Sequence, residues 1–330
     1  MDVEELVEQV LAGQRRALAR LLTRVEDGSQ QQVSEAVALL HPHTGRARIA
    51  GLTGSPGVGK STVSSALVGH WRAQGLSVAV LAVDPSSPFS GGALLGDRVR
   101  MQDHVLDEGV FVRSMASRGH LGGLSWAAPQ ALTALDAAGF DVVLVETVGV
   151  GQAEVEVAGV ADTVVVAVAP GMGDAIQAAK AGVLEIADVF CVNKADRDGA
   201  GRTARELREM QRMGAGHDDD PDAWTPPVCK TVASSGEGVD ELAGAIDAHH
   251  AHLQRSGELR ERRVQRARLQ VREIALAQVR QRLGLLSDGE LLDEVVGAVA
   301  DRALDPYAGA QRLLDALADQ GLGTAGVGGG

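Results

Sequence analysis

Lysine is scarce in this chain. Only four of its 31 basic residues are lysine, and the rest are arginine. A lysine ammonium is compact on a thin stem, whereas the arginine fork is planar and wide. The remaining lysines therefore mark places where arginine would not serve. Three of them, Lys60, Lys180 and Lys194, fall within the motifs described below.

Cysteine and long apolar segments are lacking as well. The two cysteines, Cys191 and Cys229, stand far apart in apolar stretches. This favours buried thiols over a disulfide framework or a thiolate metal site. No apolar run approaches the roughly 18 residues of a membrane helix, and the acidic opening MDVEELVEQVLAG is unlike a signal peptide. We expect a cytoplasmic protein that does not associate with membranes.

The chain also lacks an excess of positive charge, since its net charge is -13 over 330 residues. General nucleic-acid binders and proteins of anionic membrane surfaces use a positive field. Neither class fits this composition. Any phosphate that the protein binds must therefore be held by a local site.

Short apolar runs alternate with helical stretches from Ile49 to about residue 235. Such strands, nearly continuous in apolar residues, predict a doubly wound, mostly parallel α/β sheet covered on both faces. Helical spacing on either side predicts N-terminal and C-terminal helical extensions. The predicted segments are an N-terminal extension (1–45), the α/β domain (46–253), a C-terminal helical region (254–320) and a disordered tail (321–330).

The stretch GLTGSPGVGKST carries the pattern G-x-x-x-x-G-K-[ST] between a predicted strand and a predicted helix. In this pattern the glycines let the backbone wrap a β-phosphate, Lys60 reaches the β- and γ-phosphate oxygens, and the Ser61 hydroxyl binds Mg²⁺. The helix N-terminus adds a field that favours an anion. The predicted phosphate-binding residues are Gly54, Ser55, Pro56, Gly57, Val58, Gly59, Lys60, Ser61 and Thr62.

Magnesium needs oxygen ligands beyond the serine. In a doubly wound sheet they should stand at the carboxyl ends of strands, where the ligand binds. Asp84 ends the run VAVLAVD, Glu146 ends DVVLVE, and Asp97 lies in the loop PSSPFSGGALLGDRVRM. Together with Ser61, these are the predicted metal ligands.

Another apolar run, DVFCVNK, ends in the pattern N-K-x-D, formed by Asn193, Lys194 and Asp196. A carboxylate at Asp196 can accept from both the ring N–H and the amino N–H of guanine, a donor pair that adenine lacks. Asn193 can bond the base and brace the phosphate loop, and the Lys194 stem can lie over the purine. The backbone of Ala233 and Ser234 either lies near the guanine carbonyl or forms an ordinary strand-to-helix turn. GTP and GDP are the expected ligands.

Longer motifs carry a family resemblance. ETVGVGQ (146–152) resembles switch II of the SIMIBI-class P-loop GTPases that carry a glutamate where most GTPases place aspartate. More narrowly, GQRRALARLLTRVED, TGSPGVGKST, VDPSSPFSGGALLGDRVRM, RGHLGGLS, ETVGVGQAE and VNKAD together resemble the MeaB/ArgK type, the GTPases associated with methylmalonyl-CoA mutase. The similarity spans roughly residues 12–310.

The resemblance implies a homodimeric, Mg²⁺-dependent GTP hydrolase with its dimer region in the C-terminal helices. It also implies a chaperone that gates cofactor loading of an adenosylcobalamin-dependent acyl-CoA mutase and protects that enzyme. The phosphate-loop, magnesium and base residues named above carry over. Gly149 of the switch II motif joins the nucleotide-binding residues. GMGDAIQAAKAG resembles the third switch of the family, so Lys180 is a candidate for charge stabilisation once the mutase is bound.

Phosphoryl transfer to water depends on positioning and on charge neutralisation. Asp84 or Gln152 could hold the attacking water, and Arg118 could act as an arginine finger. The predicted catalytic residues are Lys60, Asp84, Glu146, Gln152 and Lys180. We expect slow turnover that a partner protein raises.

A nickel metallochaperone GTPase of the same class is the alternative, and it requires a cysteine or histidine cluster. The histidines that come close together in sequence are His41 with His43, and His249, His250 and His252. Solvated histidines on a helix or loop explain the same residues. An ATP-driven transporter subunit or a protein kinase fits poorly, because neither the ABC signature nor a D-F-G motif is present.

Overall fold

The structure is a computed structural model that describes residues 2–85, 104, 106–117, 127–147, 156–171, 185–214, 222–287 and 290–322. Its internal contacts divide the chain into two units, Met1–Arg263 and Val264–Gly330, and each is described by itself. The first unit contains the sheet and the N-terminal helices. The division into four segments at residues 45, 253 and 320 stays a prediction.

A seven-stranded sheet forms the centre of the first unit, with the order β3-β2-β4-β1-β5-β6-β7 and parallel pairing throughout. Each strand coincides with one of the apolar runs of the sequence. The predicted doubly wound, mostly parallel α/β fold is confirmed. The strands are β1 (Arg48–Thr53), β2 (Val78–Pro85), β3 (Val110–Ser117), β4 (Val142–Thr147), β5 (Thr163–Val168), β6 (Val189–Asn193) and β7 (Val228–Thr231).

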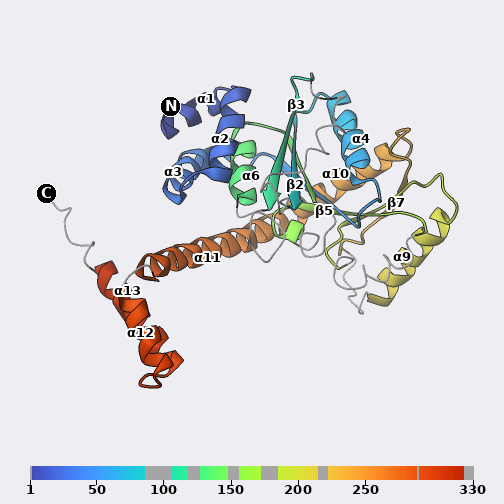
Figure 1. Ribbon diagram of the computed structural model, residues 1–330. Coiled ribbons are helices and arrows are strands. Elements are labelled where there is room, and N and C mark those ends of the chain that lie inside the picture. The colour runs from blue at the N-terminus through green and yellow to red at the C-terminus, as the bar shows by residue number, and fades with distance from the viewer. Residues whose placement is uncertain are drawn as a thin grey trace. The chain divides into compact units, whose positions relative to one another are not determined.

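Helices cover both faces of this sheet (Figure 1). The helices of the first unit are α1 (Val3–Leu11), α2 (Arg15–Asp27), α3 (Gln30–Leu40), α4 (Lys60–Ala73), α6 (Ala128–Ala137), α9 (Ala200–Gly214), α10 (Val239–Ser256) and the start of α11 (Glu258–Ser287). The described residues of this unit also contain the short 3₁₀ turns η1 (His41–His43) and η3 (Val157–Gly159). Both faces of the strands are therefore apolar, as parallel sheets require.

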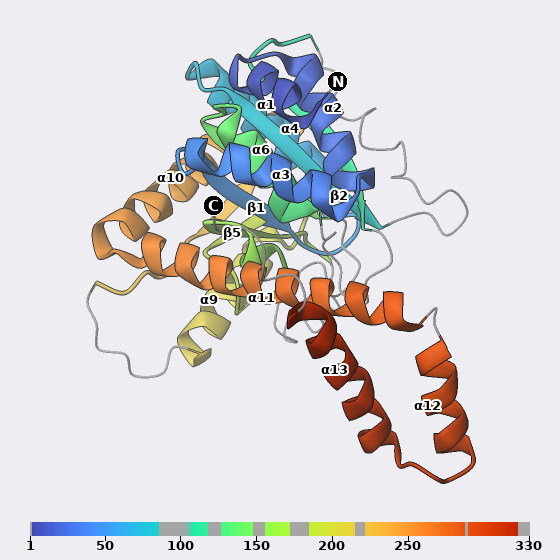
Figure 2. The same cartoon turned by 90° about the vertical axis from the view of Figure 1, so that its left-hand side faces the viewer.

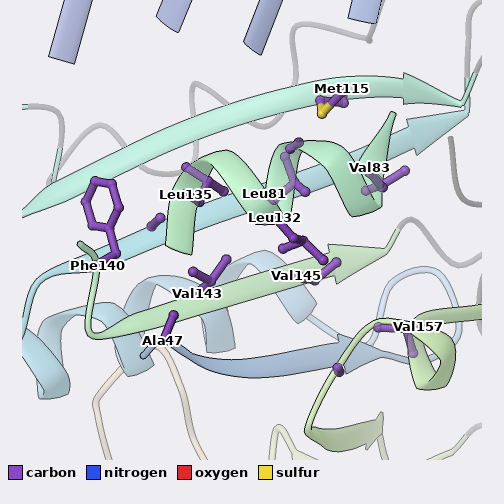
Figure 3. Close-up of a cluster of buried hydrophobic side chains, with 14 of the residues drawn as sticks. Ala47, Leu81, Val83, Met115, Leu132, Leu135, Phe140, Val143, Val145 and Val157 are labelled. Carbon is purple, nitrogen blue, oxygen red and sulfur yellow. The ribbon is translucent and has the colours of Figure 1, made fainter. Parts of the chain in front are cut away.

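One face carries α1, α2, α3 and α6, which lie together in front of the sheet in Figure 2. Their apolar side chains form one core with alternate residues of β2 and β4. Figure 3 shows Leu132 and Leu135 of α6 close to Leu81, Val143 and Val145 of these strands. The N-terminal helices thus share the core of the sheet.

The N-terminal helices are also bonded to β3, the strand at the edge of the sheet. Arg113 of β3 and Glu26 of α2 form an ion pair of 2.8 Å between side chains that are 18% and 10% exposed. Arg15 donates to the carbonyl oxygens of Asp107 and Val110, where β3 begins. Edge strands offer unpaired backbone groups, and these contacts satisfy part of this edge.

The other face of the sheet packs against α4 and α10. Trp71 and Leu67 of α4 and Leu242 of α10 are fully buried in a second core, with Leu52 and Leu144 of the central strands. Because α4 follows directly from the phosphate-binding pattern, this packing fixes the start of the helix against the sheet. The predicted site is therefore built on rigid elements.

The second unit contains the rest of α11, followed by α12 (Glu290–Ala300) and α13 (Pro306–Leu322). Within it, Gly309 of α13 lies against Val295 and Val299 of α12, where an added Cβ would approach their side chains to 3.0 and 3.3 Å. Among the helices of the described residues, none is both long enough and apolar enough to cross a membrane.

Candidate functional site

The phosphate-binding pattern forms the connection between β1 and α4, at the carboxyl end of the central strand. Gly54 has a φ of 139°, and a Cβ at this position would lie 2.1 Å from the carbonyl oxygen of Ala167 in β5. Gly59 has a φ of 94°, and a Cβ there would lie 2.6 Å from Nδ2 of Asn193. Side chains at either position would push the loop away from its neighbours, so glycine is required.

Lys60 is the first residue of α4, and its side chain folds back over the loop. Its ammonium donates to the carbonyl oxygens of Gly54 at 2.6 Å and Ser55 at 3.2 Å. The residue is only 8% exposed. The loop therefore holds the lysine charge next to the backbone that would surround a phosphate, at the positive end of the α4 dipole.

Ser61 and Glu146 meet beside this loop. Glu146 belongs to β4, where it pairs in register with Leu52 of β1 and Ala82 of β2. The Ser61 hydroxyl donates to Oε1 of Glu146 at 2.7 Å, and the two residues are 6% and 5% exposed. A hydroxyl and a carboxylate are the hard oxygen donors that Mg²⁺ takes. These residues fit a magnesium ion bound together with a nucleotide phosphate.

The base motif contacts the phosphate loop directly. Asn193, at the end of β6, donates from Nδ2 to the carbonyl oxygen of Val58 at 2.9 Å. The Lys194 ammonium donates to the carbonyl oxygen of Gly57 at 2.6 Å. Two segments more than 130 residues apart in sequence are thus joined by two hydrogen bonds.

The strand β7 supports Asn193 from the other side. Oδ1 of Asn193 accepts hydrogen bonds from the Thr231 hydroxyl at 3.1 Å and from the backbone N–H of Ala233 at 3.2 Å. Three of its polar contacts are therefore fixed by protein atoms. The sequence left Ala233 either near the guanine carbonyl or in an ordinary strand-to-helix turn, and in this structure its N–H donates to Asn193.

Asp196 lies on the turn that follows β6. Lys194 has a left-handed backbone with a φ of 58°, a conformation that is uncommon outside glycine. The N–H of Ala195 donates to the Thr231 carbonyl at 3.0 Å, which ties the turn to β7. Asp196 and Ser234 are both exposed. A carboxylate that must accept two N–H groups from a base has to be accessible, as this one is.

Five of the predicted functional residues lie outside the described residues, namely Asp97, Arg118, Gly149, Gln152 and Lys180. Of Asp84 the structure describes the backbone, which belongs to β2 and pairs with Ala116 of β3. The carboxyl ends of β2, β4, β1 and β6 thus place Asp84, Glu146, the phosphate loop and the base motif along one edge of the sheet. Pro56 and Thr62 are exposed on the loop and on the first turn of α4.

Ser64 contacts the site but is missing from the sequence prediction. Its hydroxyl donates to Oε2 of Glu146 at 2.7 Å. It lies beyond the last position that the phosphate-loop pattern specifies. The available signal was its spacing, because residues three apart on a helix share a face, and Ser61 precedes it by three.

Two histidines of the metallochaperone alternative, His249 and His252, make structural contacts. The Thr163 hydroxyl lies 2.9 Å from Nδ1 of His249, and Trp224 packs on the rings of both His249 and His252. His41 and His43 are exposed in η1. Within the described ranges, no group of three or more histidine, cysteine or acidic residues could hold a metal ion.

The two cysteines lie next to each other in the sheet, where Cys191 of β6 pairs in register with Cys229 of β7. Both are free thiols, as expected, and both are buried. Burial raises the pKa of Cys191 to about 12 and that of Cys229 to about 11. A thiol with a raised pKa is a poor nucleophile and a poor metal ligand at neutral pH.

Known proteins resemble this chain along nearly all of its length. A GTPase relative from Pyrococcus abyssi is 44% identical over 97% of this chain and 98% of its own. GTPase ArgK of Escherichia coli is 36% identical over 96% of this chain and 97% of its own. The crystal structure of an LAO/AO transport system kinase superposes with a TM-score of 0.68 at 30% identity, covering 95% of this chain and 96% of that one.

Residues 18–286 match the family described as methylmalonyl Co-A mutase-associated GTPase MeaB. A mouse protein named methylmalonic aciduria type A homolog is 34% identical over 79% of this chain and 66% of its own. The P-loop fold, the phosphate pattern and the N-K-x-D pattern agree with this match. This chain belongs to the MeaB family of P-loop GTPases, and it hydrolyses GTP.

Proposed function

We propose that this GTPase is a chaperone for an adenosylcobalamin-dependent acyl-CoA mutase, which is methylmalonyl-CoA mutase or a relative. In this role it gates the loading of the cobalamin cofactor and protects the mutase. The observation that carries the proposal is the family match over residues 18–286, whose description names association with that mutase. The named mouse relative lends further support.

The proposed nucleotide site uses the contacts at the carboxyl edge of the sheet. Lys60 and the loop amides would hold the β- and γ-phosphates in place of the carbonyl oxygens that Lys60 now contacts. Asp196 would read guanine, while Asn193 keeps the base motif attached to the phosphate loop. One nucleotide would then bridge both motifs, because side chains of the base motif already bond the backbone of the phosphate loop.

Magnesium is part of the proposal, with Ser61 and Glu146 as the described residues that would hold it and Asp84 and Asp97 as further candidates. When bound, the ion would neutralise charge that develops on the phosphate oxygens. The Ser61 hydroxyl would continue to donate to Glu146 Oε1 and would offer an oxygen lone pair to the metal. The present 2.7 Å hydrogen bond is compatible with that arrangement.

We also propose a homodimer formed through the C-terminal helices. The part of α11 that belongs to the second unit exposes several apolar side chains, at 45% for Val264, 44% for Leu269, 67% for Val271 and 42% for Leu276. Apolar side chains that stay exposed along a helix would gain stability if a second copy of the helix covered them.

The predicted cytoplasmic location and the catalytic roles of Gln152 and Lys180 stay predictions.

The proposal is tested by measuring GTP turnover with and without a purified methylmalonyl-CoA mutase, alongside co-purification of the two proteins. Turnover should be slow alone and at least about tenfold faster with the mutase, in the manner of other partner-activated GTPases. Lys60→Ala is the control for contaminating activity. If the mutase neither co-purifies nor changes turnover, the chaperone role is wrong, and tight nickel binding by calorimetry would support the metallochaperone alternative.

A further inference from the structure

We propose that Ser64 is a positioning residue for the magnesium site, acting through Glu146. It would fix the orientation of the carboxylate so that one oxygen always faces Ser61 and the metal. The inference rests on the proposed function of Ser61 and Glu146 as magnesium ligands. Ser64 lies outside the phosphate-loop pattern.

The geometry is a carboxylate held between two serines of one helix. Ser61 and Ser64 lie three positions apart on α4, and each hydroxyl donates at 2.7 Å to a different oxygen of Glu146. Hydroxyl donors to a carboxylate form short, strong bonds, and both distances are in that range. Ser64 is fully buried. It therefore acts on a nucleotide only through Glu146.

The Ser64 hydrogen bond restricts rotation of the Glu146 carboxylate beyond what the Ser61 hydrogen bond does. A glutamate side chain has three torsions, one more than aspartate, and its terminal torsion is broad. The Ser61 bond constrains Oε1 but places no donor on Oε2. A donor on Oε2 fixes the carboxylate plane. The donors come from a packed helix and the acceptor from a central strand, so the arrangement is rigid.

Ser64 also compensates the burial of a charge. Glu146 is 5% exposed, and a buried carboxylate must be hydrogen bonded to remain ionised at low cost. Two hydroxyl donors stabilise its charged form, which is the form that binds a metal. Outer residues that orient a metal ligand in this way typically change metal affinity by about 10- to 100-fold when they are removed.

The experiment is a Mg²⁺ titration of the GDP-loaded protein by calorimetry, for wild type, Ser64→Ala and Ser64→Thr. Ser64→Ala should bind Mg²⁺ about tenfold more weakly, while its GDP affinity in EDTA stays at the wild-type value. Ser64→Thr keeps the hydroxyl and should restore Mg²⁺ affinity to within about twofold of wild type. The matched control is Ser65→Ala, whose hydroxyl bonds His104 at 3.1 Å instead of Glu146.

The outcomes separate this inference from the function it rests on. A wild-type GDP complex that binds no Mg²⁺ would contradict the proposed magnesium site itself. If wild type binds Mg²⁺ and Ser64→Ala binds it equally well, Ser64 has no positioning role. A lowered melting temperature without a change in Mg²⁺ affinity would lead to the same conclusion. Should Ser64→Ala fail to fold, Ser64→Cys keeps the size but not the strong donor, and wild-type Mg²⁺ affinity in that variant overturns the inference.

Discussion

The two ends of the central sheet treat their charged side chains differently. At the carboxyl end, Lys60 and Lys194 donate to backbone carbonyl oxygens of the phosphate loop. At the amino end, Asp188 accepts two bonds of 2.9 Å from Arg262 and lies 3.3 Å from His249. A lysine that donates to neutral carbonyl oxygens can exchange them for a phosphate. The Asp188 carboxylate, by contrast, is already paired with the Arg262 guanidinium.

The exposure of two carboxylates differs in the same way between the two ends of the sheet. Asp196 is exposed where β6 ends, while Asp188, just before β6 begins, has a side chain that is 9% exposed and also accepts from the N–H of Val164. The strand β6 thus has a carboxylate near each end, Asp196 and Asp188, eight positions apart in sequence. We interpret the first as a ligand-binding group and the second as part of the fold, because buried polar groups are satisfied internally.

The largest expected effect concerns the exposed carboxylate. Asp196→Asn should lower GTP affinity by up to about 10⁴-fold, the penalty for a site whose hydrogen-bonding group no longer matches its ligand. Xanthosine triphosphate should bind in its place, because its 2-carbonyl accepts a bond from the new amide. Competition of both nucleotides against a fluorescent GDP analogue measures the change.

Folding is not at risk in this variant, since the side chain is exposed. A circular-dichroism melt that superposes on that of wild type is therefore the control. Retained preference for GTP over the xanthine nucleotide would contradict the assignment of Asp196 to the guanine base.

The second largest effect is expected at the phosphate loop, on the rate of GTP hydrolysis. Lys60→Ala should slow GTP hydrolysis by about 100-fold or more, the usual cost of removing one preorganised group that stabilises developing charge. The matched control is Lys230→Ala, which removes an exposed lysine on β7 and should leave turnover unchanged. Single-turnover phosphate release gives both rates. Equal rates for the two variants would remove Lys60 from the catalytic residues.

Much of this arrangement could be predicted from the sequence, and the reasons are local. Continuous apolar runs predicted the strands of a mostly parallel sheet, and the glycine-rich pattern predicted a phosphate loop between a strand and a helix. The contact between Asn193 and the loop was predicted from the motif as well. Each of these features is encoded within a few neighbouring residues.

Other contacts could not be predicted because they join distant segments with no motif. The sequence does not show that Asp188, His249 and Arg262 meet, since three separate elements bring them together. Ser64 was missed for a related reason, because its partner on β4 becomes a neighbour only when α4 packs on the sheet. The adjacency of the two cysteines likewise depends on the order of β6 and β7.

At the amino end of the sheet the expected effect is on stability. Asp188→Ala should lower the free energy of unfolding by about 2–3 kcal/mol, below the roughly 3–5 kcal/mol of a fully buried pair, because part of the guanidinium charge stays hydrated. The Arg262 side chain is 36% exposed. Urea denaturation measures the change. GDP affinity of the folded protein should stay within about twofold, since this end lies away from the loops.

Asp240→Ala provides the comparison for this variant. Asp240 pairs with His70 at 3.0 Å, but its side chain is 92% exposed, so its loss should cost no more than about 0.5 kcal/mol. Similar stabilities for the two variants would show that the Asp188 cluster contributes no more than a surface pair.

A pH dependence is expected at the same end of the sheet. Burial lowers the pKa of His249 to about 4 from an ordinary value of 6.5, although nearby Asp188 raises it. Between these two values the unfolded chain binds a proton that the folded protein does not. Stability should therefore be fully present above pH 6.5 and fall as the pH drops toward 4, by at most about 1.4 kcal/mol per pH unit for this one group.

His249→Asn removes the titrating ring and offers a polar atom to the Thr163 hydroxyl, so its unfolding free energy should fall less steeply over the same interval. The two proteins should give parallel curves above pH 7.5, where His249 is neutral in both the folded and the unfolded state, and this range is the internal control. Urea denaturation at half-unit steps of pH measures both slopes. Identical slopes below pH 6.5 would mean that folding does not keep this ring neutral, and the contrast between the two ends of the sheet would then rest on Asp188 and Arg262 alone.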